Sequence, residues 1–379
     1  NFSPSQLFDK SSGQLWLDPS DTSTMFQDTI GTIPVTAPGQ SVGLILDKSF
    51  GPPYPLPTNY WPSTPPAPTV ANNGTNGQFN TATGVFSNLS AGNSAYPRFT
   101  FTVPSAGRGW YYVTGQINGT RTRIISVYGT GPAQPLSYNS TTGVFQGYFS
   151  STSGATVNLL FWTNGSTTWS DVSLGAVTIQ YVPGYHCRAV NGFTYQKDSS
   201  GLSYIVTTGA SSYLTVPPGI TFGQGRVAIF AGVNKLSDAT SAAIVEYGGL
   251  GTAGTFGLYG PYTNIGEFTF VSTGTSQVTN QVVGYPSPYK AVLSALGDIV
   301  LPGGGSQNIL YINNSRYLNT GSQGTGGYGN YLTLYIGNNN IQSKRFSGPI
   351  YSLLMTSQSL AVAETTQALV WVNGKTGAF

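Results

Sequence analysis

Apolar and polar residues alternate with a period of two in short runs along most of this chain. The clearest runs lie near its end, at residues 309–315, 332–337 and 346–355, with glycine, asparagine and serine between them. Such alternation is typical of antiparallel strands that bury one face. Residues 350–355 are apolar at almost every position, so we expect that strand to be covered on both faces.

A second series of short runs occupies residues 70–183, with turn signals between its members. The runs that predict strands are 79–86, 96–103, 109–117, 122–128, 144–149, 156–162 and 172–181. Short strands at this even spacing predict a β-sandwich. In its general layout the segment is similar to jelly-roll carbohydrate-binding modules.

A proline-rich stretch precedes this second series. Residues 51–69 contain eight of the 24 prolines of the chain, a density that prevents a ladder of backbone hydrogen bonds and favours an extended conformation. We interpret the stretch as a stiff linker. The alternative is a recognition strip that presents Tyr54, Tyr60 and Trp61.

The last strands resemble those of laminin-G-like jelly rolls of the concanavalin type. In that family a strand ending in Tyr-Ile-Gly is followed, after a variable loop, by Phe-x-Gly-x-Ile-Tyr. The matching residues here are Tyr335 to Gly337 and Phe346 to Tyr351. The resemblance implies two sheets packed face to face. The one helical pattern follows at residues 359–372, with Gly374 placed to end it.

Five further segments resemble, in the same order, segments of phage virion proteins. They are Trp16 to Asp21 (WLDPSD), Met25 to Asp28 (MFQD), Val42 to Ser49 (VGLILDKS), Phe230 to Asp238 (FAGVNKLSD) and Trp371 to Gly377 (WVNGKTG). The resemblance implies a virion surface component of the tail-fibre, tail-tip or capsid-decoration type.

The phage resemblance also indicates an insertion. In that family a Gly-x-His-Ala segment directly follows Asp-Lys-Ser, whereas here Gly184 to Cys187 comes long after Ser49. We therefore predict an all-β chain: residues 1–50 plus 184–379 form a discontinuous jelly roll with one C-terminal helix, 51–69 form a linker, and 70–183 form an inserted β-sandwich. Insertion at an exposed loop is tolerated when the two loop ends lie close together.

Charge is scarce, and this excludes some classes of function. Only 7% of residues are charged, against about 25% in an average domain, and the net charge is +3. The basic residues form no stripe, so binding of nucleic acid is not expected. No apolar run reaches the roughly 18 residues of a membrane-spanning helix, so membrane insertion is not expected. The single cysteine, Cys187, excludes an intrachain disulfide.

Groups that support catalysis are also few, and we expect neither an enzyme nor a cofactor. His186 is the one histidine, no nucleophile elbow is present, and zinc-type clusters are lacking. Glycoside hydrolysis needs two facing carboxylates. If the chain were such an enzyme, Glu246 and Glu267 would be the candidate pair. No metal site is expected.

The nearest candidates for calcium ligands are three aspartates. They are Asp18, Asp21 and Asp47. Calcium requires several oxygen ligands. We interpret these three residues as turn and capping residues instead.

The remaining candidate binding groups of the chain are aromatic and amide side chains. Flat rings stack on sugar faces, and amides and hydroxyls bond to sugar hydroxyls. The candidate glycan-binding residues are Trp169, Trp162, Trp110, Tyr112, Tyr328 and Tyr331. The alternative for each is a place in a core.

These observations predict a bacteriophage virion surface protein that adheres to host surface polysaccharide. A purely structural cement protein without a ligand is the second hypothesis, and a glycan-cleaving enzyme is the third. The expected partners are other virion proteins and further copies of the chain, with a trimer favoured because phage fibres are commonly trimeric. The expected location is the surface of the virion.

Overall fold

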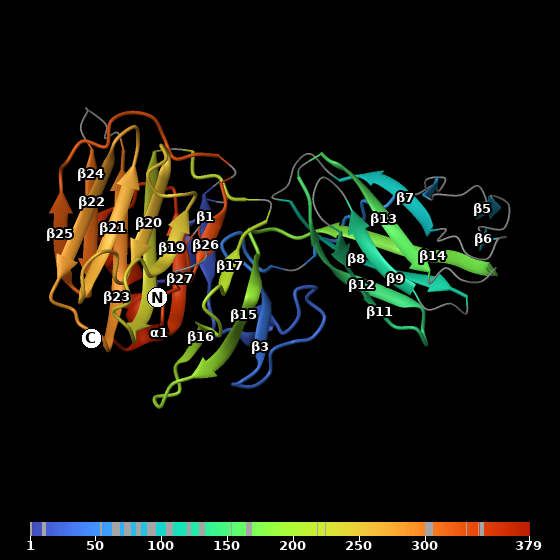
Figure 1. The fold of residues 1–379 in the computed structure, drawn as a ribbon, viewed down its shortest axis with the longest axis horizontal. Helices are drawn as coiled ribbons and strands as arrows, with labels where there is room; N and C mark the ends of the chain where they lie inside the picture. Colours follow the sequence, from blue (N-terminus) through green and yellow to red (C-terminus); the bar gives the residue numbers. More distant parts are fainter. Residues whose placement is uncertain are drawn as a thin grey trace. The chain divides into compact units, whose positions relative to one another are not determined.

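The chain folds into two compact units, each built of antiparallel strands (Figure 1). The computed structural model describes all residues except 1, 10–12, 54, 63–68, 72–76, 81–84, 89–95, 104–108, 120–122, 129–132, 153, 164–168, 218, 224, 300–305, 331, 340 and 342–344. The first unit comprises Asn1–Thr29, Ile33–Pro53 and Gly184–Phe379, and the second comprises Ile30–Thr32 and Tyr54–Pro183. The all-β fold class is confirmed.

The first unit has two layers of strands. The open layer contains β22, β21, β20, β19, β26 and β17, and the helix layer contains β1, β27, β18, β23, β24 and β25. The strands β15 and β16 connect them, with β3 and β2 beside β15. The bounds are β1 (Gln14–Leu17), β2 (Met25–Phe26), β3 (Ser41–Ile45), β15 (Cys187–Lys197), β16 (Ser203–Thr207), β17 (Tyr213–Thr215), β18 (Arg226–Lys235), β19 (Ala243–Tyr247), β20 (Thr255–Tyr259), β21 (Glu267–Thr273), β22 (Gln277–Val283), β23 (Tyr289–Asp298), β24 (Gln307–Ile312), β25 (Ser315–Asn319), β26 (Leu334–Ile336) and β27 (Ile350–Thr356).

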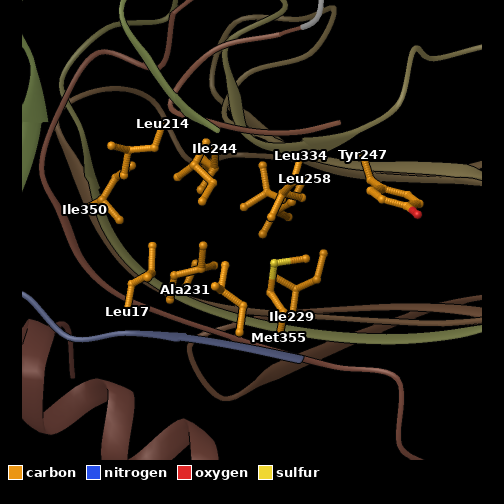
Figure 2. Close-up of a cluster of buried hydrophobic side chains, with 14 of the residues drawn as sticks. Leu17, Leu214, Ile229, Ala231, Ile244, Tyr247, Leu258, Leu334, Ile350 and Met355 are labelled. Carbon is orange, nitrogen blue, oxygen red and sulfur yellow. The ribbon is translucent and has the colours of Figure 1, made fainter. Parts of the chain in front are cut away.

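A continuous hydrophobic core fills the space between the two layers. Figure 2 shows side chains of the open layer, such as Leu214 and Leu334, pointing toward Ile229, Ala231 and Met355 of the helix layer. The alternation read from the sequence explains this arrangement, because every second residue of each strand faces the core.

The far side of the helix layer is covered by α1 (Val362–Thr376). Ala368 and Val372 of the helix pack on Phe230 and Leu354 of the sheet, so β27 is buried on both faces, as expected. The helix starts and ends later than 359–372, because Gly374 continues it and Gly377, in the left-handed conformation at φ 65°, ends it. Two short 3₁₀ helices, η1 (Pro4–Leu7) and η2 (Thr22–Thr24), lie near the N-terminus.

Buried asparagines connect the two ends of this long sheet, at β22 and at β24–β25. Asn308 of β24, fully buried, donates to the carbonyls of Phe270 and Val278 at 3.2 Å. Asn280 of β22 donates in the opposite direction, to the carbonyls of Asn308 and Tyr317 at 3.0 Å. Side-chain amides therefore replace the backbone ladder between β22 and the β24–β25 pair.

The second unit is a sandwich of a five-stranded and a six-stranded sheet. Its core is aromatic, with rings such as Phe99, Tyr111, Phe145 and Phe161 buried between the sheets. The bounds are β4 (Thr69–Ala71), β5 (Gly77–Asn80), β6 (Val85–Asn88), β7 (Tyr96–Thr102), β8 (Trp110–Asn118), β9 (Arg123–Tyr128), β10 (Gln134–Pro135), β11 (Ser137–Tyr138), β12 (Val144–Ser150), β13 (Thr156–Thr163) and β14 (Trp169–Tyr181).

The proline-rich stretch differs from the linker that we expected. The amides of Leu56 and Tyr60 donate to carbonyls of β14, at 2.8 and 2.7 Å. Trp61 is 8% exposed and packs on Phe99, with ring centroids 5.9 Å apart. Prolines interrupt a ladder without preventing single bonds at intervening residues, so Leu56 to Trp61 belongs to the second sandwich. Tyr60 and Trp61 therefore belong neither to a free linker nor to an exposed recognition strip. The third residue of the expected strip, Tyr54, lies outside the described residues.

A buried carboxylate ties together the two ends of the insertion within the first unit. Asp47 is fully buried, and its oxygens accept the backbone N–H groups of Trp16, Ser49 and Tyr185, each at 2.8 Å. Its own N–H donates to Nδ1 of His186 at 3.0 Å. Burial raises the pKa of Asp47, and the bonds from these N–H groups partly offset that rise.

Three of the five segments that resemble phage virion proteins meet beside this carboxylate: Trp16 to Asp21, Val42 to Ser49 and Trp371 to Gly377. Lys48 pairs with Asp21 at 2.6 Å and with Asp18 at 3.7 Å, and Lys375 of α1 pairs with Asp18 at 3.3 Å. The rings of Trp16 and Trp371 meet edge to face at 5.9 Å. Segments distant in sequence thus form one ionic and aromatic cluster.

We predict that Asp47→Ala destabilises the first unit strongly. The substitution leaves three buried backbone N–H groups without their acceptor, each costing about 1–3 kcal/mol, so we expect a loss of about 3 kcal/mol or more. Urea unfolding measures it. Asp47→Asn, which keeps one side-chain oxygen, should lie between the wild type and Asp47→Ala. Asp21→Ala, which removes a partly exposed ion pair, should cost about 1 kcal/mol or less; equal losses for Asp47→Ala and Asp21→Ala would contradict the assignment.

We also predict a pH dependence of stability that originates at His186. Burial lowers its pKa to about 3, so the unfolded chain binds a proton below about pH 6.5 while the folded chain does not. The contribution of His186 to the free energy of unfolding should therefore fall as the pH drops below about 6.5, with a slope that approaches about 1.4 kcal/mol per pH unit near pH 5.

The control for this prediction is His186→Gln, which keeps an acceptor for the Asp47 N–H and removes the titrating group. Asp47, with its raised pKa, acts in the opposite direction, but it is present in both proteins and cancels in the comparison. Urea unfolding at several pH values should show a flatter profile for the variant. Identical slopes would refute the role of His186, the single histidine of the chain.

Candidate functional site

The two carboxylates considered for glycoside hydrolysis are buried and serve the fold. Glu246 accepts the hydroxyl of Tyr259 and is 2% exposed. Burial acts to raise the pKa of Glu267, but the hydrogen bonds that it accepts, from the backbone of residues 262–264 and from the amide of Gln281, lower it overall. Neither carboxylate is placed to act on a substrate from solution.

The aspartates considered for calcium are held by lysines and by backbone groups. Asp18 and Asp21 pair with Lys48, and Asp47 accepts backbone N–H groups. The oxygens of Asp18 and Asp21 thus bind lysine ammonium groups, and those of Asp47 bind backbone N–H groups. In the part of the chain that the structure describes, no three His, Cys, Asp or Glu side chains gather as metal ligands would.

The structure separates the six aromatic candidates into three groups. Trp110 is 0% exposed and Tyr328 is 2% exposed, so neither ring is open to a sugar, and both assignments are corrected. Tyr328 packs edge to face on Phe256 at 5.0 Å, and its hydroxyl meets that of Ser272 at 2.6 Å. The side chains of Trp162 and Trp169 and the whole of Tyr331 lie outside the described residues. The sixth candidate, Tyr112, is partly exposed.

Tyr112 lies on the outer side of the six-stranded sheet of the second unit. Along β8, Tyr111 and Val113 face the core, so Tyr112 and Thr114 face outward. The ring of Tyr112 meets that of Tyr148, directly opposite on β12, with centroids 4.9 Å apart and an angle of 57°. Tyr148 is itself buried and supports the Tyr112 ring from one side.

Amide side chains flank this ring on both neighbouring strands. Gln146 of β12 accepts the hydroxyl of Tyr112 at 3.1 Å. Gln180 of β14 lies directly opposite Tyr112 in the ladder, and its amide donates to the carbonyl of Leu56 at 2.8 Å. We call Tyr112, Thr114, Gln146, Tyr148 and Gln180 the Tyr112 face.

The phenols of the Tyr112 face stay protonated. Burial raises the pKa of Tyr112 and raises that of Tyr148 to about 12. Both hydroxyls are therefore neutral hydrogen-bonding groups at any ordinary pH.

Sequence reasoning found Tyr112 and missed its neighbours. The alternation in 144–149 and 172–181 places Gln146, Tyr148 and Gln180 on the outer side of their strands. It does not tell which residues lie opposite Tyr112, because that depends on the register between strands.

A comparable tyrosine pair in the first unit was also missed. Tyr213 of β17 and Tyr335 of β26 are both partly exposed on the open layer, with centroids 5.4 Å apart and an angle of 57°. Tyr335 lies opposite Glu246 in the ladder. The pair resembles that of the Tyr112 face in geometry, but it lies beside a buried carboxylate rather than between amides.

Comparison with known proteins finds a distant likeness to solved structures. No family model matches the chain, and no curated protein matches it. Domains LG4-5 of the mouse laminin alpha1 chain are similar at 11% identity and a TM-score of 0.31, over 78% of this chain and 94% of that one. A tail fiber protein of an E. coli phage is similar at 9% identity and a TM-score of 0.23, over 73% of this chain and 36% of that one. We therefore argue function from the residues of this chain.

The described helices offer no span of the length and apolarity needed to cross a bilayer.

Proposed function

We propose that this chain is a bacteriophage virion surface protein that adheres to a host surface glycan through the Tyr112 face. The virion assignment is supported by the resemblance of five segments to phage virion proteins. The contacts among three of these segments, through Asp18, Lys48 and Lys375, support their common origin as the frame of one domain.

The observation that carries the adhesion proposal is the geometry of Tyr112. Its ring is partly exposed, supported by Tyr148 at 4.9 Å and fixed through its hydroxyl by Gln146 at 3.1 Å. An aromatic ring held in one orientation presents apolar surface at little entropic cost. The amides and hydroxyls beside it supply donors and acceptors for sugar hydroxyls.

Assembly would strengthen such binding. A homo-oligomer, for which a trimer is our first choice, would present several Tyr112 faces to one polysaccharide. Linked sites raise the apparent affinity without any new contact, so a weak single site suffices for adhesion.

The competing function is a purely structural virion component. In that case the Tyr112 face would be covered by a neighbouring subunit in the particle. Mass spectrometry of purified particles tests the virion assignment, and absence of the chain from the particles would remove it. Cryo-electron microscopy of the same particles shows whether the face is open or covered.

We predict that Tyr112→Ala weakens binding of the full chain to a glycan array about tenfold or more, which corresponds to about 1.4 kcal/mol. Tyr112→Phe, which keeps the ring, should retain most of the binding. Circular dichroism must show that both variants remain folded.

The matched control for Tyr112→Ala is Tyr213→Ala, which breaks the similar pair in the first unit. It should leave glycan binding unchanged. Loss of binding in Tyr213→Ala with retention in Tyr112→Ala would move the site to the open layer and contradict the proposal.

A further inference from the structure

We infer that the Tyr112 face selects uncharged glycans and rejects carboxylated or sulfated ones. This inference rests on the proposed adhesion function and specifies the class of ligand.

The first argument is the chemistry of the side chains on the outer side of this sheet. Cross-strand pairing places Tyr148, Tyr112 and Gln180 in one row, and Gln146, Thr114 and Thr178 in the next. None of the described side chains in these two rows carries a charge. With strands about 4.8 Å apart, three strands span about the width of two sugar rings, all of it neutral.

The second argument is the orientation of the two amides. The side-chain oxygen of Gln146 accepts the hydroxyl of Tyr112. Its NH₂ group is therefore the part of this amide that would donate to a ligand. Gln180 uses its NH₂ group on the carbonyl of Leu56, which assigns its oxygen as an acceptor. One donor and one acceptor on either side of a ring match sugar hydroxyls, since each hydroxyl both donates and accepts.

The third argument is the location of the cations. No lysine or arginine occurs in the strands of the six-stranded sheet, and the described cation Arg98 lies on β7 of the other sheet. An anionic sugar on the Tyr112 face would lose hydration without gaining a described counter-ion, which is unfavourable. A neutral sugar has no such loss.

The test is a binding assay of the full chain with two sets of polysaccharides. The neutral set is dextran, mannan and galactan, and the anionic set is polygalacturonate, hyaluronate and heparin. We expect at least one neutral polymer to bind about tenfold or more tightly than every anionic one. We also expect its affinity to change less than about twofold between about 50 mM and about 500 mM salt, because screening acts only on charges.

Two variants sharpen the assay. Gln146→Lys should gain binding to the anionic set, and the gain should disappear at the higher salt concentration. Gln146→Glu, matched to the wild type in size, should not gain binding to the anionic set, and it should lose affinity for the neutral polymer because its carboxylate cannot donate as the NH₂ group does.

The outcomes separate the inference from the function on which it rests. Tighter binding of an anionic polymer, or neutral binding that falls with salt, overturns the inference and leaves adhesion intact. Binding to neither set, with negative results on the glycan array, overturns both. Neutral binding that Gln146→Glu leaves unchanged also overturns the inference, because the amide then plays no part.

Discussion

The fold of the first unit depends on one buried carboxylate. Asp47 binds the amide of Trp16 in β1, the amide of Ser49 where the chain leaves the unit, and the amide of Tyr185 where it returns. Gly184 stands next to this point with φ 127°, and a Cβ there would lie 2.8 Å from His186. The two ends of the insertion are therefore fixed to one acceptor, and 130 or so residues between them can form a separate sandwich without disturbing the core.

The contacts around Asp47 explain what the segments that resemble phage virion proteins do in the fold. The matching segments supply Asp18, Asp21, Lys48 and Lys375, which neutralise one another, and Trp16, which packs on the last segment. Gly232 of the fourth segment allows Thr376 of α1 to approach, since a Cβ there would clash with it. These segments build a frame, while the proposed contact with the outside lies on the insertion.

Much of the fold was predictable because its strands alternate regularly. The predicted runs 96–103 and 144–149 became β7 and β12 within a residue or two. The site was less predictable: Trp110 and Tyr112 both point outward from β8, yet only Tyr112 is partly exposed. Alternation tells which side of a strand a residue occupies, but not what covers that side or which residue lies opposite.

The asparagine bridges between β22 and β24–β25 have a consequence for self-association. An open sheet ends in strands whose unpaired backbone groups can recruit a strand from a neighbouring molecule and start a fibre. Here amides of Asn280 and Asn308 occupy carbonyls on the facing strands at about the distance of a ladder bond. Carbonyls of both end strands, Val278 of β22 and Tyr317 of β25, are occupied in this way, so we expect this pair of edges to be a poor template for a strand from another copy.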